Sequence, residues 1–268
     1  MVAQFARARP PGAPAAVNIG LGAAAAPGRV AGATASELPD ADSADERGRV
    51  FVGGDLAPST LLAAYRGALF PMRQGDGQLA WWSPDPRAVL LPNRLHVARS
   101  LRRALNRFEI RVDSAFEAVV DGCAARSPED YHWITGEVRE AFVELHRLGW
   151  AHSVEAWTRP TDGAPAELAG GLYGIAIGRF FGGESMFHRQ RDASKAALVG
   201  LVDRLAPAKD TEPADGEAAL IDCQWMTPHL ASLGAVEVAR GEYRARLERA
   251  LAEPAPAAFG SGTPDGSR

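Results

Sequence analysis

The sequence predicts an α+β or mixed α/β fold, because helical patterns lie on both sides of a run of strand-like alternation. Three consecutive strand candidates lie at residues 152–158, 168–177 and 179–187, and a strong helix and a further strand follow them. The step from the third strand through that helix to the next strand can form a parallel crossover. With 46% hydrophobic and 23% charged residues, the 268-residue chain has the composition of a soluble globular protein.

Both ends of the chain are predicted to be disordered tails. Residues 1–49 contain 26 Ala, Gly or Pro and one aromatic residue, and residues 252–268 contain 10 Ala, Gly or Pro. Such segments bury too little apolar surface to offset the entropy lost on ordering. We therefore expect the working protein to be about residues 50–251.

In the first half of this working part, short helices alternate with short strands. Apolar residues at helical spacing, together with capping residues and a terminal glycine, define the helices. Residues 69–86 are rich in Gly, Pro and Trp and are expected to be irregular. Helices are expected at residues 60–68, 96–107, 114–123 and 136–148, and strands at 88–91 and 109–112.

The second half contains the three central strands and the crossover. The first two strands are joined by a hairpin connection at 159–166. A polar segment with Pro and Gly, residues 206–218, is expected to be a surface loop. The remaining elements are helices at 194–205, 229–233 and 242–251 and a strand at 219–224.

Composition excludes several classes of function. Two cysteines, Cys123 and Cys223, form no disulfide framework, and none of the six histidines lies at metal-ligand spacing from a Cys or an acid. We therefore expect a cytoplasmic protein with no metal and no cofactor. No run of 18 apolar residues predicts a membrane span, and no heptad pattern predicts an oligomer, so a monomer is the default expectation.

A predicted helix start near residues 192–194 is a candidate anion site, because helix N-termini present free N–H groups and a positive dipole end. Arg189, Arg191 and Lys195 surround it, and phosphate is the natural ligand. Glu184, in the preceding glycine-rich strand, needs a partner if it is buried. It either forms a salt bridge with one of these cations or binds a cation or hydroxyl group. Ser185 lacks the sequence context of a hydrolase nucleophile.

Asp222 and Gln224 lie at the end of an apolar strand, where open sheets place their ligand groups. Strand alternation puts both side chains on one face and Cys223 on the other. Asp222 is a candidate general base or orienting group, and Gln224 a candidate for holding a carbonyl group or Asp222 itself. A structural role for Asp222 as a loop cap is the equally open alternative.

Six arginines against one acid make residues 94–111 a local basic stripe on a chain whose net charge is −4. Such a stripe is expected where a protein contacts a phosphate backbone, and a plain solvated face is the alternative. Two aromatic segments, 81–87 and 131–135, could stack on bases or line an apolar pocket, although core packing also explains them. The stripe comprises Arg94, Arg99, Arg102, Arg103, Arg107 and Arg111.

Short segments in a fixed order resemble one family, the leucyl/phenylalanyl-tRNA–protein transferases. Each segment is weak by itself, but the ordered set over residues 53–240 is highly specific. The segments are Gly53-Gly-Asp-Leu56, Leu61-Leu-Ala-Ala-Tyr65, Phe70-Pro71, Trp81-Trp-Ser-Pro-Asp-Pro-Arg87, Trp133-Ile-Thr135, Ala151-His-Ser-Val-Glu155, Gly170-Gly-Leu-Tyr-Gly174, Gly183-Glu-Ser-Met-Phe187, Ala193-Ser-Lys195, Leu220-Ile-Asp-Cys-Gln224 and Ser232-Leu-Gly-Ala235.

The resemblance implies an aminoacyltransferase of the bacterial N-degron pathway. Leu or Phe, possibly Met, would pass from tRNA to the α-amino group of proteins that begin with Arg or Lys. It also implies a small N-terminal domain, residues 50–87, and a catalytic domain at 88–251 similar to the GCN5-related N-acetyltransferases. The basic residues of the stripe and of the anion site would contact tRNA phosphates.

The family pattern also implies roles for individual residues. Asp222 and Gln224 match the catalytic pair, and Glu184 is expected to hold the aminoacyl end of the tRNA. Met186 and Leu172 match positions of the hydrophobic pocket, and Trp133 matches a wall of the adenosine–aminoacyl site.

Some positions depart from the family pattern. The family's usual residues are Trp at position 72, Ser at 188 and Met at 172, where this chain has Met72, His188 and Leu172. These differences bear on the aminoacyl preference more than on the reaction.

Two other functions compete. An acetyl-CoA-dependent N-acetyltransferase would need a glycine-containing pyrophosphate loop, and residues 189–194 contain no glycine. A non-catalytic tRNA binder would have no need for Asp222, Gln224 and Glu184.

Overall fold

The structure is a computed structural model that describes residues 2–3, 38–125, 133–160, 165–205 and 219–259. Within these residues a main sheet contains β1 (Val2–Ala3), β5 (Arg87–Leu90), β6 (Phe108–Val112), β7 (Ala151–Thr158), β8 (Leu168–Ile177), β9 (Phe180–His188), β10 (Leu220–Gln224) and β11 (Val236–Val238). Its order is β11-β5-β10-β9-β8-β7-β6, with β1 paired to β9. A small antiparallel sheet has the order β2-β4-β3, formed by β2 (Arg49–Val52), β3 (Phe70–Arg73) and β4 (Leu79–Trp82).

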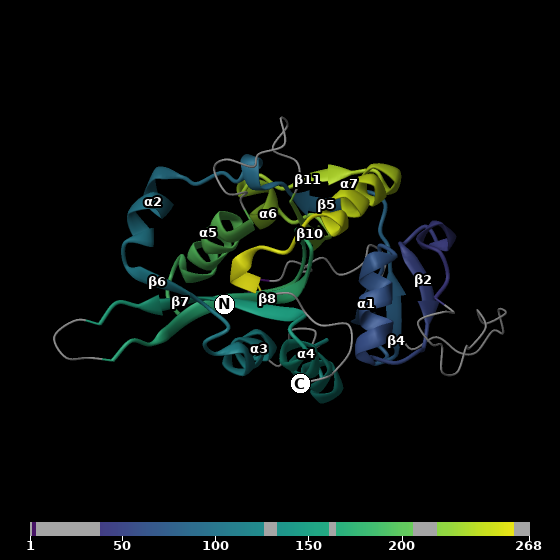
Figure 1. Cartoon of the computed structure of the whole chain (residues 1–268), viewed down its shortest axis with the longest axis horizontal. Coiled ribbons are helices and arrows are strands. Elements are labelled where there is room, and N and C mark those ends of the chain that lie inside the picture. The colour runs from purple at the N-terminus through teal and green to yellow at the C-terminus, as the bar shows by residue number, and fades with distance from the viewer. Residues whose placement is uncertain (1, 4–37, 126–132, 161–164, 206–218, 260–268) are drawn as a thin grey trace.

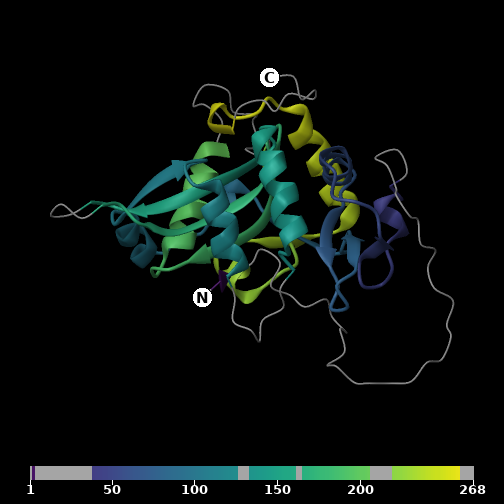
Figure 2. The ribbon, with the colours of Figure 1, turned by 90° about the horizontal axis from the view of Figure 1, so that it is seen from below.

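Helices cover both faces of the main sheet, which makes the fold α+β (Figure 1). One face packs on α5, and α3 and α4 cover the other (Figure 2). The small sheet and α1 lie beside the main sheet near α7. The helices are α1 (Pro58–Arg66), α2 (Arg99–Leu105), α3 (Phe116–Ala124), α4 (Gly136–Arg147), α5 (Ala193–Leu205), α6 (Pro228–Ser232) and α7 (Arg240–Ala252), with 3-10 turns η2 (Ala41–Ser43), η3 (Pro92–Arg94) and η4 (Ala257–Phe259).

The predicted parallel crossover is confirmed. Strands β9 and β10 are parallel neighbours, and α5 lies between them in the chain. Their pairing runs from Leu220 opposite Phe180 to Asp222 opposite Gly182. The chain therefore places the carboxyl end of β10 beside the middle of β9, where Glu184 lies.

The expectation that residues 69–86 are irregular was wrong. They contain β3 and β4, which pair in register from Phe70 opposite Trp82 to Arg73 opposite Leu79. Aromatic and apolar residues drive this pairing, while the Gly and Pro residues mark the turns around it. Pro71 is tolerated because β3 is an edge strand, and backbone N–H groups on the free side of an edge strand have no partner strand to bind.

Parts of both predicted tails are folded. In the N-terminal tail, Asp40 caps η2 and pairs with Arg244 of α7, and Ala41 is buried. In the C-terminal tail, Phe259 is 1% exposed and packs against Phe181. The average composition of a tail does not reveal single residues, such as these, that pack against the rest of the protein. Residues 1, 4–37 and 260–268 of the predicted tails, and the loop at 206–218, lie outside the described residues.

The predicted helix at 96–107 is shorter than expected. Its regular part is α2, and η3 precedes it. No side chain caps the start of α2. The chain reaches it in extended conformation, with the His96 N–H donating to the carbonyl oxygen of Leu233.

Candidate active site

A buried ion pair lies at the centre of the site. Arg87, at the start of β5, donates from Nε and Nη2 to the two carboxylate oxygens of Asp222 on β10, at 2.9 and 2.6 Å. Both side chains are at most 1% exposed. The guanidinium contacts the rings of Phe70 and Tyr243, with Cζ 4.5 and 4.6 Å from their centroids. This environment holds the carboxylate in one fixed orientation.

Gln224 is fixed by one contact within its own strand, β10, and by one with the neighbouring strand β9. Its backbone N–H donates to Asp222 Oδ1 at 2.9 Å, and its Nε2 donates to the Gly183 carbonyl oxygen at 2.7 Å. Its φ is +60°, a left-handed conformation that non-glycine residues adopt at a cost. The side-chain oxygen, Oε1, is buried and has no partner among the described residues. That oxygen is free to accept a hydrogen bond from a substrate.

Two β-bulges create this arrangement. On β9 the extra residue is Glu184, because Gly183 lies opposite Gly174 and Ser185 opposite Tyr173. On β10 the pairing with β5 shifts between Asp222 and Gln224. Bulges commonly re-aim side chains next to active sites. Here they turn polar side chains of two neighbouring strands toward the same space.

Glu184 is paired with a tyrosine. Tyr65 of α1 donates from its hydroxyl to Glu184 Oε1 at 2.5 Å, and both residues are buried. Of the two alternatives for Glu184, the salt bridge with Arg189, Arg191 or Lys195 does not form among the described residues, and a hydrogen bond with a hydroxyl group is present instead. Burial raises the pKa of Glu184 to about 8, against an ordinary value of 4.5. A Cβ atom at Gly182 would lie 3.1 Å from the Tyr65 ring, so a larger residue there would require the ring to shift by a few tenths of an ångström.

A narrow crevice, with no room for a water molecule in this structure, lies between several of the predicted residues and forms the cavity of this site. It brings Trp133, which precedes α4, together with Glu184 and Gln224. Met72 replaces one wall that the family pattern fills with Trp. The nearby indole ring of Trp225 packs edge-on against Phe70, at a centroid distance of 5.0 Å. The cavity is lined by Phe70, Pro71, Met72, Trp133, Glu184 and Gln224.

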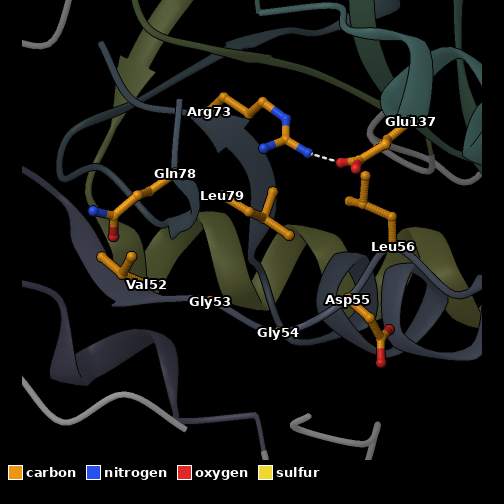
Figure 3. A pocket seen from close by; sticks show the side chains of 9 residues that line it. All are labelled: Val52, Gly53, Gly54, Asp55, Leu56, Arg73, Gln78, Leu79 and Glu137. Atoms are coloured by element: carbon orange, nitrogen blue, oxygen red, sulfur yellow. Dashed lines mark hydrogen bonds and ion pairs between the residues drawn. The ribbon is translucent and has the colours of Figure 1, made fainter. Parts of the chain in front are cut away.

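A second, more open cavity of about 470 Å³ is bordered by the end of β2, the segment that leads into α1, and residues of β3 and β4 (Figure 3). Arg73 and Glu137 form an ion pair across it and link the small sheet to the start of α4. Its walls are Val52, Gly53, Gly54, Asp55, Leu56, Arg73, Gln78, Leu79 and Glu137. None of the residues singled out for catalysis or pocket formation lines it.

The predicted pocket residues Met186 and Leu172 lie on the opposite face of the sheet from this site. They are cross-strand neighbours on β9 and β8, fully buried in the core layer under α5. The structure therefore brings Trp133, Glu184, Asp222 and Gln224 together, but Met186 and Leu172 do not line their cavity.

The two predicted groups of cations meet on one surface. Arg107, after α2, forms an ion pair with Asp192 at 3.6 Å and donates to the Arg191 carbonyl oxygen at 3.2 Å. Lys195 at the start of α5 also pairs with Asp192, at 3.3 Å. The exposed members of this surface are Arg94, Arg99, Arg102, Arg103, Arg107, Arg189 and Arg191. Arg111 differs, because it pairs with Glu109 on β6.

Comparison with known proteins decides the family. The leucyl/phenylalanyl-tRNA protein transferase family matches residues 89–248, and the N-terminal domain of the same family matches residues 54–85. The chain belongs to the leucyl/phenylalanyl-tRNA–protein transferase family. It is thus an aminoacyltransferase by membership, as the sequence resemblance implied.

Curated relatives with this family name match most of the chain. One from Magnetococcus marinus is 46% identical over 82% of this chain and 91% of its own length. Another from Azoarcus sp. is 49% identical over 82% of this chain and 88% of its own. A third from Anaeromyxobacter sp. is 50% identical over 81% and 88%.

Sequence reasoning missed three residues of the site: Arg87, Tyr65 and Tyr243. Arg87 opens an apolar strand and Asp222 interrupts another. Two opposite charges embedded in apolar strands signal a buried pair, because neither is stable there alone. The two tyrosines carry no such signal, since their spacing fits core packing equally well.

Two kinds of feature are absent from the described ranges. No helix there is long and apolar enough to cross a membrane. No group of three or more His, Cys, Asp or Glu side chains in those ranges is arranged to hold a metal ion.

Proposed function

We propose that this protein transfers Leu or Phe from the ester of aminoacyl-tRNA to the α-amino group of proteins that begin with Arg or Lys. The new peptide bond marks the acceptor for degradation through the N-degron pathway. Family membership supports this reaction, and the buried, unpartnered Oε1 of Gln224 is the observation within the chain that carries it. Because the donor is charged tRNA, the reaction belongs in the cytoplasm.

The catalytic pair is Asp222 and Gln224. An amine attacks an ester only when it is neutral, oriented and close to the carbonyl carbon. Gln224 Oε1 accepts a hydrogen bond from the attacking amine, and Asp222 holds Gln224 in its unusual backbone conformation. Arg87 and Tyr243 keep Asp222 in place. Trp133 and Met72 form the walls against which the aminoacyl–adenosine end packs.

The apolar part of the aminoacyl group selects the donor. The family pattern assigns Met186 and Leu172 to this pocket, and they lie on the opposite face of the sheet from Glu184, Met186 on β9 itself and Leu172 beside it on β8. Since they are now fully buried, a Leu or Phe side chain enters only if they are displaced. Each buried methylene contributes about 0.8 kcal/mol, so shape and size set the preference.

The exposed cations on η3, α2 and the start of α5 hold the acceptor stem. Their grip is independent of sequence because they meet the phosphate backbone. The chain acts as a monomer in this proposal. Residues 50–87 form a small N-terminal domain, and 88–251 form a catalytic domain related to the GCN5-related acetyltransferases.

A donor-exchange assay tests the reaction. The protein is incubated with a peptide beginning with Arg and either radiolabelled Leu-tRNA or radiolabelled acetyl-CoA. We expect label on the peptide from Leu-tRNA only, and much less with a matched peptide beginning with Glu. Label from acetyl-CoA alone would replace this proposal with an acetyltransferase.

A further inference from the structure

Two buried carboxylates, Asp222 and Glu184, flank the reacting groups, and peptide-bond formation needs one proton acceptor. Asp222 is the choice that the sequence pattern suggests, because it belongs to the conspicuous strand end. The structure gives the two groups very different hydrogen-bonding capacity. This inference rests on the proposed transfer reaction and concerns which carboxylate handles its proton.

The carboxylate of Asp222 is fully used. Oδ1 accepts from Arg87 Nε and from the Gln224 backbone N–H, each at 2.9 Å. Oδ2 accepts from Arg87 Nη2 at 2.6 Å and from the Tyr243 hydroxyl at 3.0 Å. A carboxylate offers about four lone-pair sites, and these four bonds fill them. Asp222 therefore has no site left to receive a substrate proton and acts as a fixed anchor.

Glu184 has the opposite character. Its Oε1 accepts one hydrogen bond, from Tyr65, and its Oε2 has no hydrogen-bond partner among the described residues. The side chain is 1% exposed, yet it lines the same cavity as Gln224 and Trp133. The bulge on β9 is what turns it toward that cavity. If Gln224 Oε1 holds the substrate amine, Glu184 is the neighbouring carboxyl group that still has an oxygen able to accept a hydrogen bond.

The groups around Glu184 tune it toward proton exchange near neutral pH. Burial and the charge of Asp222 raise its pKa, while the Tyr65 hydrogen bond and the charge of Arg87 lower it. The result, a pKa of about 8, lies close to the 7.7–8.0 of an ordinary α-amino group. Proton transfer between groups of matched pKa near the working pH is efficient.

We propose that Glu184 is the catalytic proton acceptor of the transfer reaction, and that Tyr65 positions it. As the amine nitrogen forms its bond to the ester carbonyl carbon, a proton passes from that nitrogen to Glu184 Oε2. The bond between the carbonyl carbon and the ribose oxygen then breaks, and Glu184 returns the proton to the leaving oxygen. The products are an amide and a tRNA hydroxyl, and Glu184 ends as it began.

Single-turnover kinetics with Glu184→Gln test the assignment, because Gln preserves the shape and the acceptor for Tyr65. We expect kcat to fall at least about 100-fold, the usual contribution of general acid–base catalysis, with KM for aminoacyl-tRNA within about threefold of the wild type. A raised KM with unchanged kcat would make Glu184 a binding residue only and would overturn the proposal.

The pH dependence separates Glu184 from the amine, which titrates in the same range. Hydroxylamine, an acceptor that stays neutral across this range, removes the amine's own titration. With it, the wild-type rate should rise with pH to a plateau above about pH 8 and Glu184→Gln should be flat. Persistence of the rise in Glu184→Gln contradicts the proposal.

Tyr65→Phe gives an independent check on the same pH dependence, the rise of the rate with pH that we call its limb. Because the Tyr65 hydrogen bond lowers the pKa of Glu184, its loss should move the limb to higher pH and leave the plateau rate within about threefold. An unmoved limb would count against Glu184. Failure of the wild type to leucylate an Arg peptide would instead refute the proposed function, so the two failures are distinguishable.

Discussion

Removing the arginine of the buried pair should destabilise the fold strongly. Arg87→Gln deletes two charge-assisted hydrogen bonds, at 2.9 and 2.6 Å, and leaves Asp222 at 0% exposure with only the Tyr243 hydroxyl and one backbone N–H. Breaking such a pair costs about 3–5 kcal/mol, since the remaining charge is buried without its counter-charge. Urea unfolding should show this loss as a lower midpoint with an unchanged slope.

The double variant Arg87→Gln/Asp222→Asn isolates the interaction. With both charges gone, we expect it to be less destabilised than the sum of the two single variants, by about 2 kcal/mol or more. Arg147→Gln is the matched surface control, because Arg147 is 67% exposed in its ion pair with Glu144, and its effect should stay below about 1 kcal/mol. If Arg87→Gln costs no more than Arg147→Gln, the buried pair is not the anchor of the site.

Three further changes test other parts of the structure. The free energy of unfolding of Glu184→Gln should rise relative to that of the wild type as pH increases from 4.5 to about 8, because the folded wild type retains a proton there that the unfolded chain has lost. At 1.36 kcal/mol per pKa unit, the difference in unfolding free energy reaches about 5 kcal/mol at pH 9. Equal pH dependence in both proteins would contradict the burial of this group. Arg102→Ala/Arg103→Ala should flatten the plot of log affinity for tRNA against log salt by about one per lost phosphate contact, whereas Arg147→Ala should leave it unchanged; an equal slope in the double variant would make the stripe a solvated face. Phe259→Ala should cost about 3–5 kcal/mol in thermal unfolding if the segment after α7 packs as described, and a melting temperature equal to that of the wild type would show that it does not.

The sequence predicts the main sheet well because its strands follow local rules. Alternation around the glycines of β8 and β9, and the strong helix α5, define the crossover that places β10 beside β9. The small sheet was missed because its three strands are only four residues each, and β3 and β4 lie among Gly and Pro. Turn residues dominate such short windows, whereas pairing between the strands decides the fold.

The residue types of the site could be predicted from the sequence, but the hydrogen bonds and ion pairs that connect them could not. Glu184, Asp222 and Gln224 stand out as polar residues in apolar strands, and the structure brings them together. Their partners come from elements far along the chain: Tyr65 from α1, Arg87 from β5 and Tyr243 from α7. The bulges that aim the acids depend on strand register, which no local pattern specifies. Whether Asp222 is free or saturated therefore needs the three-dimensional arrangement.

In the proposed reaction, aminoacyl transfer takes place at the cavity that Gln224 and Glu184 share. The most direct measurement quantifies leucylated Arg peptide formed from Leu-tRNA by the wild type and by Gln224→Ala, with the tRNA dissociation constant measured in parallel. We predict product from the wild type, at least about 100-fold less from Gln224→Ala, and equal tRNA affinity. Equal product from both proteins would place the chemistry elsewhere on the chain, and absence of product from the wild type would contradict the proposed function itself.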